Sequence, residues 1–263
     1  MPITIERLPK SSKIDSINRV RDRVTLTRAA VLEHFLGHLM TDHLIFQDLR
    51  NNGGRLNPDL ASRIARSYFV ARNLRIGKTN AKRKRFAATL NRAAYRCPKS
   101  LAKRKEACIR LTIRLRDNNF SSGNSAPASA ASKLMWFLKP RGWTMYDRFA
   151  AQGVLYPRSG NSLEKLGRFY DAIEERKFTS DIHRVQRIIK ESPFKNLHGT
   201  RVIDKFLMLI GMDDERRDIS MKTSANFCGA LPIGVRRKLM ALAWDIAEEC
   251  GPDLLRLPND RIG

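Results

Sequence analysis

The chain has 263 residues, 42% of them hydrophobic, so it is long enough to form a large domain or two lobes around a core, and disorder is not the default. Its 50 Lys and Arg residues against 26 Asp and Glu residues leave a formal charge of +24, which would repel itself unless the partner were a polyanion such as nucleic acid. A membrane surface would attract the same charge. The sequence has neither a long apolar run nor the pattern of a signal peptide, so we expect a soluble, cytoplasmic protein with no membrane partner.

Cysteine and histidine spacing does not favour a metal site. The four cysteines are scattered, without a C-x-x-C pair: Cys97, Cys108, Cys228 and Cys250. We interpret them as reduced, structural thiols, and they do not support an iron–sulfur cluster. His34, His38 and His43 lie close together, but H-E-x-x-H is absent and no nearby cysteine completes a ligand set. The sequence therefore predicts no metal and no cofactor.

Apolar residues recur at intervals of three and four, while alternating patterns typical of strands are scarce. In chain order this periodicity predicts helices over residues 25–48, 58–73, 80–95, 100–117, 128–139, 144–152, 162–176, 180–191, 199–211 and 232–250. Clusters of Gly, Pro, Asn and Ser separate several of them. No repeat or long low-complexity linker is present. We expect an all-α fold in which residues 1–263 form a single compact domain of two closely packed helical lobes.

Positive charge is concentrated between Arg72 and Arg116, where Glu106 is the only acidic residue. Charge runs are often only solvated surfaces, but this one lacks the acidic partners that would neutralise it, so we expect it to bind the phosphate backbone. Such contacts carry no sequence information. The candidate phosphate-binding residues in this run are Lys82, Arg83, Lys84, Arg85, Lys103 and Arg104.

The segment 118–150, NNFSSGNSAPASAASKLMWFLKPRGWTMYDRFA, carries the most specific pattern. A basic helix ends near Asp117, a loop of small residues follows, and an apolar helix begins near Ala128. A hairpin of this kind can direct backbone N–H groups at a phosphate, although most such loops are only turns. Its candidate DNA-binding residues are Ser122, Gly123, Asn124, Ser125, Ser129, Ser132 and Arg148.

Within this segment a Ser132-Lys133 pair is followed by the aromatic pair Trp136-Phe137, a Pro-containing loop and the run 146–150, YDRFA. This order resembles bacterial proteins of 8-oxoguanine-glycosylase-like fold, which belong to the helix-hairpin-helix (HhH-GPD) DNA glycosylase superfamily. The resemblance covers residues 118–150, as hairpin, Gly/Pro loop and catalytic Asp segment. The rest of the chain is similar only in helical character and charge.

The resemblance implies that Asp147 is the catalytic aspartate. Cleaving an N-glycosidic bond builds positive charge on the sugar, which a fixed carboxylate stabilises while it orients the nucleophile. The alternative is that Asp147 only caps a helix. Lys133 matches the lysine that attacks C1′ in bifunctional members, but the usual Leu-Pro-Gly-Val-Gly-x-Lys sequence is absent. Lys133 could instead contact phosphate or extend from an apolar helix to solvent.

Aromatic residues near Asp147 are candidates for the pocket that holds a flipped base. Trp143, Tyr146 and Trp136 are assigned to it, with loop-borne Trp143 as pocket or wedge and core packing as the alternative for Trp136. Further walls are expected from the segments 34–46 and 68–75.

The resemblance implies that the protein is an enzyme, a monomeric DNA glycosylase. This enzyme flips a damaged or modified base out of double-stranded DNA and excises it to leave an abasic site. If Lys133 is not a nucleophile, the glycosylase is monofunctional. The alternative is a non-catalytic helical DNA-binding module. Two substrate classes are open: oxidised or alkylated bases in repair, and hypermodified viral bases in defence against phages. We favour defence, because the hairpin departs from that of repair enzymes.

Overall fold

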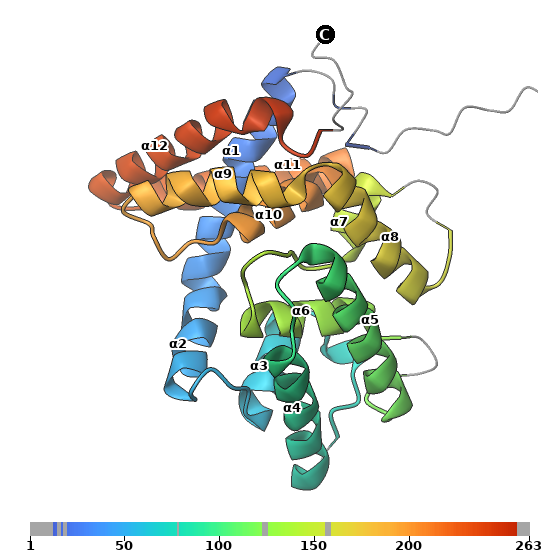
Figure 1. The fold of residues 1–263 in the computed structure, drawn as a ribbon. Coiled ribbons are helices and arrows are strands. Elements are labelled where there is room, and N and C mark those ends of the chain that lie inside the picture. Colours follow the sequence, from blue (N-terminus) through green and yellow to red (C-terminus); the bar gives the residue numbers. More distant parts are fainter. Residues whose placement is uncertain are drawn as a thin grey trace, which may run out of the picture.

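The computed structural model describes residues 13, 14, 17, 20–77, 79–122, 126–155 and 159–256 (Figure 1). In this part of the chain all regular structure is helical apart from an isolated bridge between Leu74 and Ser121. The all-α prediction is therefore confirmed. No helix among the described residues has the length and apolar character needed to cross a membrane.

The helices are, in chain order, α1 (Val20–Gly37), the π-helical turn η1 (His38–Asp42), α2 (His43–Asn51), α3 (Pro58–Ser67), the short 3-10 turn η2 (Ala71–Asn73), α4 (Asn80–Tyr95), α5 (Leu101–Asp117), α6 (Ala128–Leu138), α7 (Arg148–Val154), α8 (Ser162–Glu175), α9 (Phe178–Glu191), α10 (Gly199–Gly211), α11 (Asp214–Ala230), α12 (Ile233–Glu249) and a final 3-10 turn, η3 (Gly251–Asp253).

Figure 1 shows two groups of helices. In one, α1 packs against α10, α11 and α12, and α9 packs against α10 and α12. In the other, α6 packs against α3, α4 and α5. Two helices join the groups: α2 contacts α6, and α8 packs against both α5 and α9, while α7 lies on α10. The loop from α6 to α7 therefore runs along the junction of the two groups.

Helix α7 approaches α10 unusually closely. A Cβ atom built on Gly211 would lie 1.7 Å from the backbone oxygen of Phe149, and one on Gly153 would lie 3.0 Å from that of Leu207. Only glycine permits backbones to meet at these distances. This contact fixes the start of α7, and with it Asp147, relative to α10.

Two predicted helices were wrong in extent, and one helix was not predicted. The helix predicted over 25–48 lies within a continuous helical stretch that contains the π-turn η1, but the helix predicted over 58–73 ends at Ser67, before Phe69 adopts a left-handed backbone with φ of 55°. The helix predicted over 144–152 begins only at Arg148, because residues 143–147 form no helix. Helix α11 was not predicted, since most of its side chains are exposed and it lacks a regular apolar face.

Candidate active site

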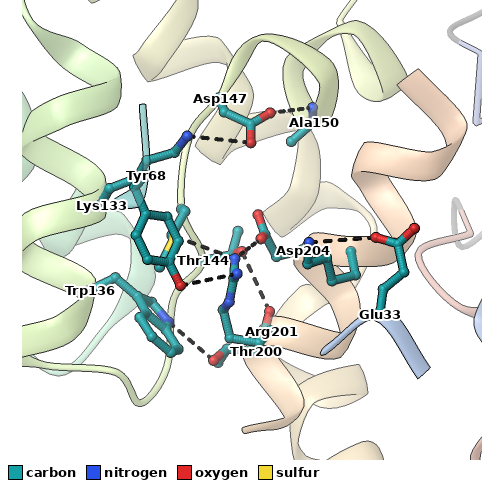
Figure 2. A network of polar contacts seen from close by, with 12 residues as sticks. Glu33, Tyr68, Lys133, Trp136, Thr144, Asp147, Ala150, Thr200, Arg201 and Asp204 are labelled. Carbon is teal, nitrogen blue, oxygen red and sulfur yellow. Dashed lines mark hydrogen bonds and ion pairs between the residues drawn. The ribbon is translucent and has the colours of Figure 1, made fainter. Parts of the chain in front are cut away.

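Lys133 and Asp147 lie side by side at a small cavity in the junction between the helix groups (Figure 2). Lys133 comes from the middle of α6 and Asp147 immediately precedes α7. The Lys133 Nζ atom is 3.7 Å from Asp147 Oδ2, and the two side chains are 13% and 11% exposed. The cavity has a volume of about 220 Å³. The two residues assigned to catalysis thus share one partly enclosed site.

The two carboxylate oxygens of Asp147 have different partners. Oδ1 accepts a hydrogen bond of 2.9 Å from the backbone N–H of Ala150, so Asp147 is the N-cap of α7. Oδ2 forms the ion pair with Lys133 (Figure 2). The capping contact holds the carboxylate in one orientation. The second oxygen remains directed toward Lys133 and the cavity.

A buried charged network forms the floor of the site. The Arg201 guanidinium donates to Asp204 and to the Tyr68 hydroxyl, the latter at 3.4 Å (Figure 2). The same hydroxyl donates to Asp42, whose Oδ2 atom is 3.8 Å from Arg201 Nε. The guanidinium also lies 5.4 Å from the centre of the Trp136 ring. Buried charges persist when they are paired and hydrogen-bonded in this way.

Burial changes the titration of this network. Burial raises the pKa of Asp204 to about 6, with a further contribution from the nearby charge of Asp147, while Arg201 opposes the rise. Burial also raises the pKa of Tyr68 well above its usual value. Asp204 is therefore a proton-binding group that titrates close to neutrality behind the Lys133–Asp147 pair.

The remaining walls combine apolar groups with positive charge. Met145 and Met208 line the cavity together with Lys205, whose Nζ atom is 3.5 Å from a carboxylate oxygen of Glu33. Phe69 also lines the cavity, although its side chain is 83% exposed. An aromatic ring in this position is available to a ligand that enters from solvent.

Trp136 and Trp143 do not line this cavity, so their assignment to a base pocket was wrong. Both are buried, at 0% and 1% exposure. Trp136 Nε1 donates to the Thr200 hydroxyl at 3.2 Å, and Trp143 Nε1 donates to the carbonyl of Lys139 at 2.6 Å. Trp143 cannot act as a surface wedge, because its ring stacks inside the protein on Tyr170.

Tyr146 is also directed into the core rather than the cavity. It is 9% exposed and packs edge-on against Phe169, with 5.5 Å between ring centres. Ser132 is fully buried, and its hydroxyl accepts from the Tyr146 N–H at 3.0 Å and lies 3.2 Å from the Tyr146 carbonyl, to which it donates. The assignment of Ser132 to DNA binding was therefore wrong: it ties α6 to the segment before Asp147.

The other hairpin candidates have varied positions. Ser129 is half-buried at the start of α6, and its carbonyl accepts from Ser132. Ser122 is half-buried and donates to the carbonyl of Arg72 at 2.6 Å. Arg148 is exposed, with its guanidinium 5.8 Å from the centre of the Phe149 ring. Three candidates lie outside the described residues: Gly123, Asn124 and Ser125.

Most of the basic candidates lie on the surfaces of α4 and α5, but Arg104 does not. It is buried and donates to the carbonyls of Pro98 and Arg141, so its assignment to phosphate binding was wrong. Arg83 forms an ion pair with Asp59. Four others are at least partly exposed: Lys82, Lys84, Arg85 and Lys103. Two of these, Lys82 and Arg85, lie near the face of the Phe120 ring.

Sequence reasoning missed the charged floor of the site. Helix α10 is almost entirely apolar apart from three charged residues. Asp204 and Lys205 lie one turn after Arg201. Charged residues are rarely buried without a partner. Their presence in an otherwise apolar helix is a sequence signal that could have predicted a buried charged site here. The segments 34–46 and 68–75 do contribute walls, through Asp42 and Tyr68 among others.

Comparison of the chain with family models, with curated proteins and with solved structures gave no match.

Proposed function

We propose that the protein is a DNA glycosylase of the helix-hairpin-helix type, which excises a base from double-stranded DNA at the Asp147 cavity. The observation that carries the proposal is the Lys133–Asp147 pair, 3.7 Å apart, at a small cavity in a chain of formal charge +24. The charge favours a polyanionic substrate, and the carboxylate suits a reaction that develops positive charge on a sugar.

In the proposed reaction a flipped nucleotide places its sugar beside Asp147 Oδ2 and its base in the cavity. The C1′–N bond breaks, and the base leaves with the bonding electrons. Asp147 stabilises the cationic sugar and accepts a proton from the attacking water. The cavity of about 220 Å³ is smaller than the ~300 to 1,000 Å³ of pockets for drug-sized ligands, in keeping with a single base. Tyr68 and Met145 offer flat and apolar surface to that base.

Lys133 supports two versions of this chemistry. As a nucleophile, Lys133 first gives a proton to Asp147, and its neutral Nζ then attacks C1′; the base departs with the electrons of the C1′–N bond and takes up the proton that the nitrogen loses. Opening of the sugar then gives an imine, which borohydride reduces to a stable crosslink. As a cation, Lys133 binds a phosphate while water attacks. Trapping with borohydride separates the two: a crosslink in the wild type that is absent from Lys133→Gln supports the covalent version, and excision without a crosslink supports water.

A second candidate function is a non-catalytic DNA-binding module, and the capping contact from Ala150 N–H to Asp147 favours it. In that case Asp147 has only a structural role. Substitutions that keep the cap but remove the charge decide between the two, because Asn and Ser are both good N-cap residues.

The test compares wild type with Asp147→Asn and Asp147→Ser on unmodified, oxidised, alkylated and hypermodified phage DNA. Released bases and alkali-labile abasic sites are measured together with DNA affinity. We expect excision by the wild type, a loss of at least a hundredfold in both variants, and little change in affinity or thermal stability. Absence of product from every DNA, despite tight binding, would establish the binding module instead.

The same panel addresses the substrate class. We propose hypermodified viral bases as the substrate, on the ground that the hairpin lacks the usual Leu-Pro-Gly-Val-Gly-x-Lys sequence of repair enzymes. Excision from phage DNA with none from oxidised or alkylated DNA supports a role in defence. Excision of oxidised guanine with no action on phage DNA supports repair.

A further inference from the structure

We propose that a second cavity, separate from the Asp147 site, binds a small phosphorylated nucleotide. It has a volume of about 510 Å³, within the range of pockets that enclose small-molecule ligands. It lies between α2, α9 and the two loops 139–142 and 192–198. In Figure 1 these elements surround the end of α6 that is nearer to α2.

The cavity is lined by positive charge without acidic residues. Arg50, Arg141, Lys190 and Lys195 line it, and no Asp or Glu is among its lining residues. All four side chains are exposed, and none forms an ion pair with a carboxylate of the described chain. Elsewhere on this surface cations such as Arg187 are paired with acidic residues. Four cations around one concave site, without a carboxylate partner in the described part of the chain, are suited to a ligand with more than one phosphate.

The interior of the cavity provides flat rings and polar groups. The Phe46 and His198 rings lie 5.0 Å apart, and His38 and His43 lie beside them with 6.0 Å between their centres. Burial lowers the pKa of His198 to about 4, so its ring is neutral near pH 7 and can stack on a base. Asn196 provides an amide within the lining. A rim of cations around aromatic surface fits a nucleotide better than free phosphate.

This cavity is distinct from the catalytic cavity and from the proposed DNA surface. The two cavities have no lining residue in common. They are separated by the buried Trp136 side chain, which bonds to Thr200 at one cavity and lies against Arg201 at the other. The cavity is also at the C-terminal end of α6, whereas the hairpin loop precedes its N-terminal end. The inference does not depend on glycosylase activity.

The test is calorimetric titration of the DNA-free, full-length protein with ATP, with adenosine and inorganic pyrophosphate as separate probes. We expect one saturable site per chain for ATP, and weaker binding of each separate probe. Arg141→Gln and Lys190→Gln should each weaken ATP binding by about tenfold, since each removes a charge-assisted phosphate contact. Both side chains are exposed, so both variants should fold normally.

The matched controls are Lys222→Gln and Lys238→Gln, which remove the same charge from exposed positions on α11 and α12, outside both the cavity and the proposed DNA surface. We expect them to change ATP affinity by less than twofold. Non-saturable binding of ATP, or an equal loss of ATP affinity in the control variants, would show that ATP binds only through the overall positive charge of the protein. Either result would overturn the proposal. A short single-stranded oligonucleotide that saturates the site where ATP does not would identify a DNA strand as the occupant instead.

Discussion

The two oxygens of Asp147 allow one residue to satisfy both a folding and a chemical requirement. Because Oδ1 caps α7 through Ala150, the carboxylate is held without using Oδ2. Such restraint is what a catalytic group requires, since its rotamer must be fixed before substrate arrives. The capping role and the proposed catalytic role are therefore compatible in the same side chain.

Trp143 belongs to the core, so its replacement should affect stability. Trp143→Ala removes a ring with 1% exposure that stacks on Tyr170 and bonds to the Lys139 carbonyl. We expect the free energy of unfolding to fall by about 3 to 5 kcal/mol, measured in urea. Trp244→Ala is the control, because that ring is 41% exposed, and its loss should be much smaller. Equal losses would contradict the core assignment.

Asp204 should make the stability of the protein fall as the pH rises from about 4 to about 6. Burial raises its pKa from 3.8 to about 6 in the folded state, so the folded protein retains a proton that the unfolded chain has released. The stabilisation is complete below about pH 4, is lost as the pH rises through 6 and does not change further above about pH 7.

The variant Asp204→Asn isolates this effect. The free energy of unfolding of the wild type minus that of the variant should decrease between pH 4 and pH 6 and be constant at pH 7. Asp181, whose pKa burial also raises to about 6, is present in both proteins and cancels in the difference. A difference that is constant from pH 4 to pH 7 would show that Asp204 does not titrate in this window.

At the scale of elements, the sequence predicted helices that have a clear apolar face and missed features that depend on other parts of the chain. Helices such as α4 and α10 were predicted at their observed positions. The π-turn η1 was not, because its register depends on contacts of Asp42 with Tyr68 and Arg201, which are distant in sequence. Local periodicity contains no information on such contacts.

The close contact of α7 with α10 predicts that a substitution at Gly211 reduces both stability and excision. Gly211→Ala places a methyl group where the Phe149 backbone oxygen lies, so α7 must move away from α10. We expect a loss of about 3 kcal/mol or more in unfolding experiments. Excision should fall more than DNA affinity, because Asp147 moves with α7.

Gly229→Ala is the control for this substitution. Gly229 lies within α11, and a Cβ atom there has nothing within 4 Å. In this open position alanine should stabilise the helix by about 0.5 to 1 kcal/mol. If both variants lost the same stability, the contact between α7 and α10 would not be as close as the structure indicates.

At the scale of the whole molecule, half of the candidate site could be predicted from the sequence. Lys133 and Asp147 were found because one short segment carries both. Arg201 was not predicted, and Asp42 and Tyr68 were expected only as members of the segments 34–46 and 68–75, since only the packing of α10 against the other helices brings the three residues to the same cavity. The burial of Trp136 and Trp143 also depends on this packing. The sequence alone therefore did not show whether their rings line a pocket or pack in the core.

The distribution of charge over the whole surface predicts how DNA binding should depend on salt. If the exposed face of α4 and α5 contacts the backbone, the logarithm of the binding constant should fall linearly with the logarithm of salt concentration. Lys84→Gln and Lys103→Gln should each reduce the magnitude of that slope by about 1, because both side chains are exposed. Arg83→Gln should reduce it less, since Arg83 is paired with Asp59. Titration of an unmodified duplex at several salt concentrations measures the slopes, and unchanged slopes for Lys84→Gln and Lys103→Gln would place the DNA on another face of the molecule.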